Sequence, residues 1–244
     1  MRLQRSNNQL RKISIKPNFM DNAFSSCLIE FGNTKVICSV TIENHLPRWL
    51  KGSGKGWITA EYAMLPTSTH TRTDRESIKG KLSGRTQEIQ RLIGRSLRNC
   101  VDLSLLSEIL IKIDCDVLLA DGGTRTTAIN GSWVALSLTV KKLIENKLLF
   151  RNPIRYGLSA VSCGMIGNDV LLDLDYKEDS SADADANFVF TNNGGIVEIQ
   201  CTGEQTYLEH EQFIKMYQLA REATIEIYKL QLESIEKSNE SYLS

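Results

Sequence analysis

Residues 109–127, ILIKIDCDVLLADGGTRTT, contain the pattern that decides the fold. In the first part, apolar residues alternate with lysine and aspartate, at Ile109, Ile111, Ile113, Cys115 and Val117. This alternation predicts a long strand with one buried face. The strand runs into Asp121-Gly122-Gly123, and apolar residues at helical spacing predict a helix from about Thr127 to Asn146. The stretch therefore predicts a strand, a tight turn and a helix in succession.

The segments on either side predict further strands and two more helices. Apolar runs flank Gly32-Asn33 and predict a hairpin over residues 25–43, and another strand is predicted over 56–62. Helices are predicted over 85–101 and 209–237, and strands over 157–166, 169–176, 186–191 and 195–201. This order is typical of the α/β class, in its α+β type. It predicts a single mixed-sheet domain over residues 1–237 and a frayed tail over 238–244.

Composition places the chain among globular proteins. It has 244 residues, of which 41% are hydrophobic, and no apolar run approaches the roughly 18 residues that a membrane span needs. The start of the sequence has no signal-peptide pattern, so a cytoplasmic protein without membrane contact is expected. Six cysteines occur without a CxxC pair and are interpreted as reduced thiols. With only three histidines, reactions that need several imidazoles are disfavoured.

The net charge of zero conceals a strong asymmetry along the chain. Residues 1–100 hold 17 Lys and Arg against 7 Asp and Glu, a net charge of +10. Residues 101–244 hold 12 against 22, a net charge of −10. A polyanion-binding surface combined with a metal or acid/base site would produce this distribution, although two acidic helices would also explain the second value.

Two helix starts are candidates for binding phosphate. Gly122 and Gly123 allow a tight turn whose N–H groups point at one place, and Arg125 adds a guanidinium. The plainer alternative is an ordinary turn with Thr126 as a helix cap. Arg85 follows Gly84 at the start of the next predicted helix, where the ordinary alternative is a solvated arginine.

The most unusual segment is the acidic run 173–185, DLDYKEDSSADAD. On a strand, Asp173 and Asp175 project from one face, and the loop beyond supplies Asp179, Asp183 and Asp185. Carboxylates in this number suit Mg²⁺ or Mn²⁺, or acid/base catalysis. The alternative is an ordinary acidic hairpin.

Four arginines are candidates for contact with RNA. Arg72 and Arg75 lie in the long polar segment 66–84, which is expected to be a mobile loop. Arg91 and Arg95 lie on one side of the predicted helix 85–101, where a solvated helix face is the ordinary alternative.

Several blocks of the sequence resemble, in order and spacing, those of the bacterial ribonuclease PH family. They are Gly56–Pro66, Gly84–Ile93, Asp114–Val117, Ala120–Arg125, Glu178–Ser180 and Asp185–Asn187. The resemblance covers roughly residues 2–235. It implies a ribosomal-protein-S5-domain-2-like fold, the ribonuclease PH fold, and a homohexameric ring built as a trimer of dimers.

The resemblance also implies an activity and its residues. The implied enzyme is a phosphorolytic 3′→5′ exoribonuclease, a tRNA nucleotidyltransferase, which trims tRNA precursors beyond their 3′ CCA end and acts on other RNA 3′ ends, as in rRNA processing. Inorganic phosphate is the co-substrate, nucleoside diphosphates are released, and the reverse reaction adds nucleotides from them. Phosphate binding falls on Arg85, Gly123, Thr124 and Arg125. Catalysis and Mg²⁺ or Mn²⁺ binding fall on Asp179 and Asp185.

Two alternatives remain open at this stage. A catalytically silent RNA-binding ring subunit would share the fold, but it has no physical reason to keep aspartates beside arginines. A hydrolase that uses a metal and water would need histidines or a general base that this chain scarcely offers. Thr67 stands where the family usually has arginine, and residues 201–205 also depart from the family pattern. These departures affect expectations of RNA affinity and ring assembly more than those of chemistry.

Overall fold

The strands of the protein form two separate sheets in the computed structural model, which describes residues 2, 5–204 and 207–240. The first sheet has the order β1-β2-β3-β5-β4. Its strands are β1 (Ile13–Pro17), β2 (Ser25–Phe31), β3 (Thr34–Glu43), β4 (Trp57–Met64) and β5 (Leu110–Leu119). All neighbours are antiparallel except β4 and β5, which are parallel. The hairpin at Gly32-Asn33 and the long strand before the diglycine are confirmed.

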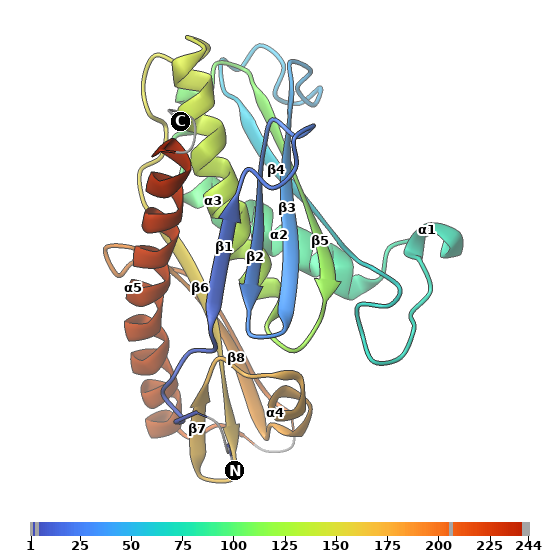
Figure 1. The fold of residues 1–244 in the computed structure, drawn as a ribbon, viewed down its shortest axis with the longest axis vertical. Coiled ribbons are helices and arrows are strands. Elements are labelled where there is room, and N and C mark those ends of the chain that lie inside the picture. Colours follow the sequence, from blue (N-terminus) through green and yellow to red (C-terminus); the bar gives the residue numbers. More distant parts are fainter. Residues whose placement is uncertain (1, 3–4, 205–206, 241–244) are drawn as a thin grey trace.

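The second sheet is entirely antiparallel, in the order β7-β6-β8-β9. It consists of β6 (Leu158–Ile166), β7 (Asp169–Leu172), β8 (Ala184–Thr191) and β9 (Ile196–Gly203). The predicted α/β class is therefore confirmed, but the expected single mixed sheet is in fact two sheets, one mixed and one antiparallel. Figure 1 shows the first sheet in the upper half of the molecule and the second in the lower half.

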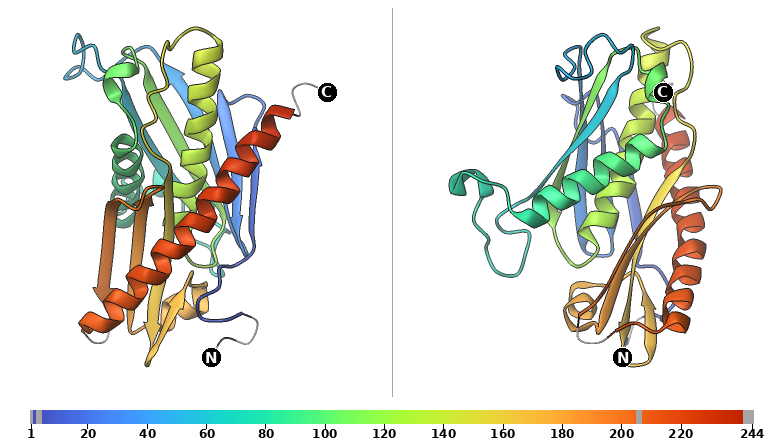
Figure 2. Two further views of the ribbon diagram at one scale, coloured as in Figure 1. Left: turned by 90° about the vertical axis from the view of Figure 1, so that its left-hand side faces the viewer. Right: turned by 180° about the vertical axis from the view of Figure 1, so that it is seen from behind.

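Helix α3 (Thr124–Glu145) holds the two sheets together. It packs against β2 and β3 of the first sheet and against β6 of the second, as Figure 2 shows from two sides. Most of its residues are buried, so the helix has no broad polar face. Helix α2 (Gly84–Asn99) covers β4, and the long α5 (His210–Glu240) crosses β6 and reaches β1. The remaining helices are short: α1 (Glu76–Lys79), α4 (Tyr176–Ser181) and a 3₁₀ turn at Leu103–Leu105.

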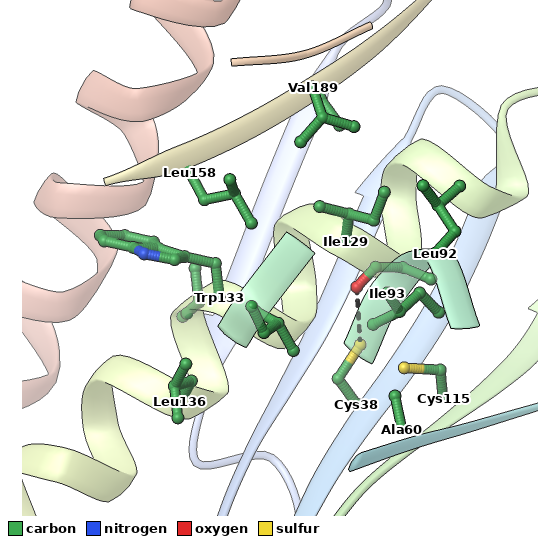
Figure 3. Packing of buried hydrophobic residues seen from close by; sticks show 14 of the residues in the cluster. Cys38, Ala60, Leu92, Ile93, Cys115, Ile129, Trp133, Leu136, Leu158 and Val189 are labelled. Atoms are coloured by element: carbon green, nitrogen blue, oxygen red, sulfur yellow. Dashed lines mark hydrogen bonds between the residues drawn. The ribbon is translucent and has the colours of Figure 1, made fainter. Parts of the chain in front are cut away.

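One continuous core lies where α2 and α3 meet both sheets. Figure 3 shows Leu92 and Ile93 of α2 beside Ile129 and Trp133 of α3, with Val189 above them. Cys38 and Cys115 face each other across β3 and β5, and both are buried. All six cysteines are free, and only Cys201 is exposed. Burial raises the pKa of the Cys100 thiol to about 12, as expected for a thiol that serves as an apolar core side chain.

Several elements differ from the sequence expectations. Helix α3 begins at Thr124, three residues before the expected start, because Gly123 adopts a left-handed conformation and ends the turn there. Strand β1 was not predicted. Helix α5 continues to Glu240, so the first part of the expected tail is helical, and residues 241–244 lie outside the described residues. Among the helices described, none is long and apolar enough to cross a membrane.

A buried amide group stabilises the contact between α3 and the second sheet. Strand β7 pairs with β6 only from Cys163 to Ile166, so it does not reach Ala160. The side chain of Asn130 takes its place: Nδ2 donates to the Ala160 carbonyl and Oδ1 accepts from the Ala160 N–H, both at 2.8 Å. Gln231 of α5 donates to the Asn130 carbonyl at 3.2 Å and accepts from Ser159 at 3.0 Å. Side chains of α3 and α5 thus satisfy both backbone groups of Ala160 and the Leu158 carbonyl.

We expect Asn130→Ala to lower the free energy of unfolding by about 2–4 kcal/mol, because it removes two buried hydrogen bonds and leaves the Ala160 N–H and carbonyl unpaired. Urea denaturation followed by circular dichroism measures the change. The control is Asn44→Ala, at an exposed position, for which a change within about 0.5 kcal/mol is expected. Equal stability of the two variants would contradict this account of the contact.

Candidate active site

The diglycine turn leaves the first turn of α3 open for an anion. Gly122 and Gly123 have φ angles of 78° and 65°, which side chains rarely adopt, and a Cβ on Gly122 would overlap the carbonyl oxygen of Leu174. No side chain caps the helix. The N–H groups of its first turn therefore point outward without a capping acceptor, at the positive end of a 22-residue helix.

Arg125 is held at this helix end by a chain of polar contacts. Its Nη1 donates to Gln200 Oε1 at 2.8 Å, and Gln200 Nε2 donates to Glu88 at 2.8 Å. Glu88 also lies 3.6 Å from Arg125. Next to it, the Tyr62 hydroxyl donates to Thr124 Oγ1 at 2.8 Å. Glu88 of α2 and Gln200 of β9 thus fix the side chain of Arg125, and Tyr62 of β4 fixes that of Thr124. Both Thr124 and Arg125 are predicted to bind phosphate.

Arg85 reaches the same place from the start of α2. Ser83 caps this helix, its Oγ accepting from the Thr86 N–H at 3.1 Å, and leaves Arg85 in the first turn with its side chain exposed. Burial raises the pKa of Tyr62, and the positive charges of Arg85 and Arg125 both oppose that shift. The two arginines predicted to bind phosphate are therefore electrostatic neighbours, although 40 residues separate them.

Asp179 and Asp185 are within electrostatic reach of both arginines. Asp179 lies on α4, whose start is fixed by a capping box between Asp175 and Glu178. Asp185 lies on β8, between Gly164 of β6 and Thr202 of β9. Desolvation raises the pKa of Asp179, and the charges of Arg85 and Arg125 oppose the shift. Desolvation followed by the charge of Asp179 raises the pKa of Asp185.

The rest of the acidic run is arranged differently from the sequence expectation. Strand β7 ends at Leu172, so Asp173 and Asp175 do not project from one strand face. Asp173 is buried and binds Arg11, Asp175 caps α4, and Asp183 accepts from the Gly167 N–H at 2.6 Å in the β6–β7 turn. The metal or acid/base interpretation is consequently restricted to Asp179 and Asp185.

The four candidate RNA arginines lie on two segments. Arg72, which pairs with Asp74 at 3.0 Å, and Arg75 belong to the segment before α1, which projects from the body of the molecule in Figure 1. A cleft of about 890 Å³ separates this segment from β4 and β5 and extends to Arg85. Arg91 and Arg95 are exposed on α2, and Arg95 donates to Glu198 of β9 at 2.7 Å.

Three further residues contribute to the site without having been predicted. Gln200 orients Arg125, Tyr62 orients Thr124, and the charge of Glu204 raises the pKa of both Asp179 and Asp185. Gln200 lies on β9, a strand with no unusual composition, and the β8–β9 register places it opposite Asn187. Glu204 follows the end of β9, where its N–H donates to the Asp183 carbonyl at 2.9 Å. Tyr62 lies within the Gly56–Pro66 block. On β4 it is a buried residue between the exposed Glu61 and Ala63.

Together these residues form an arrangement suited to phosphate groups. It combines open N–H groups with two arginines that are within electrostatic reach of two aspartates, and the pKa values of both aspartates are raised by desolvation. No His, Cys, Asp or Glu side chains within the described part of the chain form a group of three or more that could hold a metal ion. Such a combination defines an enzyme that brings anionic groups together and stabilises charge between them.

Comparison with known proteins identifies the class more closely. Residues 9–142 match the family described as "3′ exoribonuclease family, domain 1", and residues 158–223 match domain 2 of the same family. Ribonuclease PH of Rhodospirillum rubrum is 52% identical over 227 residues, which are 93% of this chain and 95% of that protein. Ribonuclease PH of Maricaulis maris is 51% identical over 231 residues, or 95% and 97% of the two chains.

Solved structures have the same fold at lower sequence identity. The Archaeoglobus fulgidus exosome, solved with RNA bound to its active site, has a chain 22% identical, with a TM-score of 0.78 over 92% of this chain and 90% of that one. A chain of an archaeal exosome core is 20% identical, with a TM-score of 0.75 over 93% and 89%. The chain belongs to the ribonuclease PH family of 3′ exoribonucleases. It is a phosphorolytic 3′→5′ exoribonuclease, as the resemblance implied, and the interpretation of residues 1–237 as one catalytic domain stays a prediction.

The charge of Glu204 provides a test of the two aspartates. We expect Glu204→Gln to lower the pKa of both, and therefore to shift one limb of the pH–rate profile toward lower pH. The shift is expected to be roughly 0.2–0.7 pH unit, since an exposed charge pair contributes about 0.2–1 kcal/mol. The measurement is phosphate-dependent release of nucleotides from RNA across the pH range, with Glu236→Gln, at the far end of α5, as control.

The limb that moves depends on the role of the carboxyl groups. If both aspartates act as carboxylates, activity is lost as the pH falls through their raised pKa, and the acid limb moves. If Asp185 donates a proton, activity is lost as the pH rises through its pKa, and the alkaline limb moves. A profile that does not move, or that moves to higher pH, would contradict the electrostatic coupling.

Proposed function

We propose that this enzyme trims tRNA precursors beyond their 3′ CCA end, with inorganic phosphate as the attacking group and nucleoside diphosphates as products. The observation that carries the proposal is the open N-terminus of α3, where Arg125 is fixed by Gln200 and lies within the electrostatic reach of Asp179 and Asp185. The identity of 52% to a ribonuclease PH along nearly the whole chain supports the same conclusion.

The residues suit phosphate as a nucleophile better than water. Phosphate is already an anion with nucleophilic oxygens at neutral pH, so the site needs no histidine base. What it needs is a means of holding two anions in contact, and the first-turn N–H groups of α3, Arg125 and Arg85 supply this. Thr124, oriented by Tyr62, adds a hydroxyl group at the same helix end.

The reaction then follows in a single displacement. An oxygen of the bound phosphate forms a bond to the phosphorus of the last phosphodiester, and the bond from that phosphorus to the ribose O3′ breaks. The released O3′ takes up a proton, and the terminal nucleotide leaves as a nucleoside diphosphate. Arg85 and Arg125 are placed to neutralise the charge that accumulates on the phosphoryl oxygens. The same contacts favour the reverse reaction when nucleoside diphosphate is abundant.

Asp179 and Asp185 are suited to hold Mg²⁺ or Mn²⁺. Their carboxyl groups are close enough for the charge of Asp179 to raise the pKa of Asp185, so a cation between them would relieve a repulsion. Mg²⁺ is commonly bound by one or two carboxylates together with waters and substrate phosphates. A bound cation would supply charge stabilisation at the phosphoryl group; the alternative role for Asp185 is donation of the proton to O3′.

RNA contacts and assembly complete the proposal. Arg72 and Arg75 on the projecting segment and Arg91 and Arg95 on α2 would contact the RNA backbone, outside the phosphate site. Ile78 on the projecting α1 is 76% exposed, which is unusual for so large an apolar side chain and supports burial against another copy. We propose in addition that the protein forms a homohexamer, built as a trimer of dimers. We also propose a location in the cytoplasm, because six free cysteines suit a reducing compartment.

The first experiment tests the co-substrate directly. The purified protein is incubated with a tRNA carrying a short 3′ extension and Mg²⁺, with and without inorganic phosphate, and the released nucleotides are identified. We expect nucleoside diphosphates, and only with phosphate. Release of monophosphates without phosphate would indicate hydrolysis. Binding of RNA without release would indicate a catalytically silent ring subunit.

Replacement of Arg125 tests the phosphate site. We expect Arg125→Ala to reduce phosphate-dependent release by about 10²–10³, the usual effect of losing one donor that stabilises transition-state charge. The circular dichroism spectrum and the sedimentation coefficient should not change. Arg155→Ala, at an exposed arginine that pairs with Asp102, is the control and should retain full activity. An unaltered rate for Arg125→Ala at saturating and at low phosphate would refute this assignment.

A further inference from the structure

The amino-terminal arginines bind the acidic segment that carries Asp179. Arg2 and Arg5 donate to Glu178 Oε2 at 2.9 and 3.0 Å, and Glu178 also accepts from the Asp175 N–H at 3.0 Å. These contacts fix both ends of the first turn of α4. In Figure 1 the amino-terminal segment passes beside β7 and α4.

Arg11 makes contacts in two directions. On one side, its Nη2 donates to Asp173 Oδ1 at 2.7 Å and its Nε to Asp173 Oδ2 at 3.0 Å, a two-pronged pair. On the other side, its Nη1 donates to the Asp121 carbonyl at 2.6 Å, and its Nη2 lies 3.4 Å from the Gly122 carbonyl. A single buried guanidinium, with 7% of its side chain exposed, therefore binds Asp173, between β7 and α4, and the turn before α3.

The two segments that Arg11 joins are also in direct contact. Gly122 packs against the backbone of Leu174 and Asp175, with no room for a Cβ. The Tyr176 N–H donates to Asp121 Oδ1 at 3.3 Å. The phosphate-binding turn and the start of the aspartate-bearing helix thus share one seam, and Arg11 and Asp173 lie at its buried side.

Asp173 is in a conformation that the chain does not favour without a partner. Its φ angle is 55°, in the left-handed region, and only 2% of its side chain is exposed. Its N–H donates to the Ser162 carbonyl at 2.7 Å, and its carboxylate also accepts from the Arg11 N–H at 2.8 Å. Desolvation lowers the pKa of Arg11, but the charge of Asp173 and its hydrogen bond to the guanidinium outweigh this effect, so the net shift of the Arg11 pKa is upward. Strained backbone that neighbours hold in place is frequently found at sites of function.

We propose that Arg11 is a positioning residue for phosphorolysis: through Asp173 and the carbonyls of Asp121 and Gly122, it sets the distance between the bound phosphate and Asp179. It does not touch the reacting atoms. The proposal rests on the proposed function, because it assumes that phosphate binds at α3 and that Asp179 acts beside it.

The test uses the conservative variant Arg11→Lys in the full-length protein. Lysine keeps the positive charge but has a single ammonium group, so it cannot span Asp173 and the Asp121 carbonyl together. We expect about a tenfold fall in kcat and about a tenfold rise in the KM for phosphate, since small misplacements of reacting groups have large effects on rate. The Kd for tRNA, measured by fluorescence anisotropy without phosphate, should stay within twofold of the wild type.

A second variant and a control make the outcome decisive. Asp173→Asn keeps the shape of the side chain, removes its charge and one acceptor, and should change the same two constants in the same direction by a smaller factor. If circular dichroism shows that Arg11→Lys does not fold, the result for Asp173→Asn alone tests the role of Arg11. Arg155→Lys, at the exposed pair with Asp102, should leave all constants unchanged.

The possible results separate the two proposals. If the wild-type protein releases no diphosphates with phosphate, the proposed function fails and the variants are irrelevant to it. If the wild type is active and both folded variants keep kcat and the phosphate KM within twofold, the role of Arg11 is refuted. An equal loss of tRNA affinity would also refute it, because it would indicate general damage to the fold.

Discussion

The burial of α3 between two sheets is the constraint on which the rest of the structure depends. A helix that contacts β2 and β3 on one side and β6 on the other needs apolar or satisfied polar residues around its whole circumference. Asn130 shows how a polar group is accommodated there, by replacing a missing strand at Ala160. With the helix fixed on all sides, its N-terminus is fixed as well, so the anion site that we propose at Thr124 and Arg125 needs no rearrangement of this helix.

Ion pairs explain the opposite charges of the two parts of the chain. The basic first part is not a single RNA-binding surface, because several of its arginines bind carboxylates of the second part, as in the pairs Arg5–Glu178, Arg11–Asp173 and Arg95–Glu198. Exposed pairs such as Arg95–Glu198 contribute little to stability. Arg11 and Asp173 are buried, and loss of one partner from a buried pair typically costs about 3–5 kcal/mol because the other charge is left uncompensated. Charge asymmetry in the sequence therefore reports internal pairing as much as ligand binding.

Elements whose conformation depends on neighbouring residues were predicted correctly from the sequence. Alternation predicted β5, Gly32-Asn33 predicted the hairpin, and Gly122-Gly123 predicted a tight turn, because each depends on neighbouring residues. The strand expected through Asp173 and Asp175 was predicted wrongly, because the conformation there depends on Arg11, which lies 162 residues away from Asp173. The capping box at Asp175 and Glu178 was a local signal for α4 and was overlooked in favour of strand alternation. Gln200 and Glu204 could not be predicted, since tertiary structure alone brings them to Arg125 and Asp185: Gln200 through the register of β9, and Glu204 through its position just after that strand.

Phosphorolysis makes the relative position of the two sheets a chemical requirement. The groups that we propose to hold phosphate belong to α2 and α3, on the side of the first sheet, and the carboxyl groups belong to α4 and β8, on the side of the second. Neither set stabilises the transition state without the other, because anions that repel each other must be brought within bonding distance. A hydrolytic nuclease can activate a water molecule at a single side chain or metal ion. This enzyme must instead hold a phosphate ion between groups that belong to the two sheets and their helices. The shared helix α3 and the buried contacts between residues 121–123 and 173–175 meet that requirement in the folded protein itself, so little binding energy is needed to assemble the site.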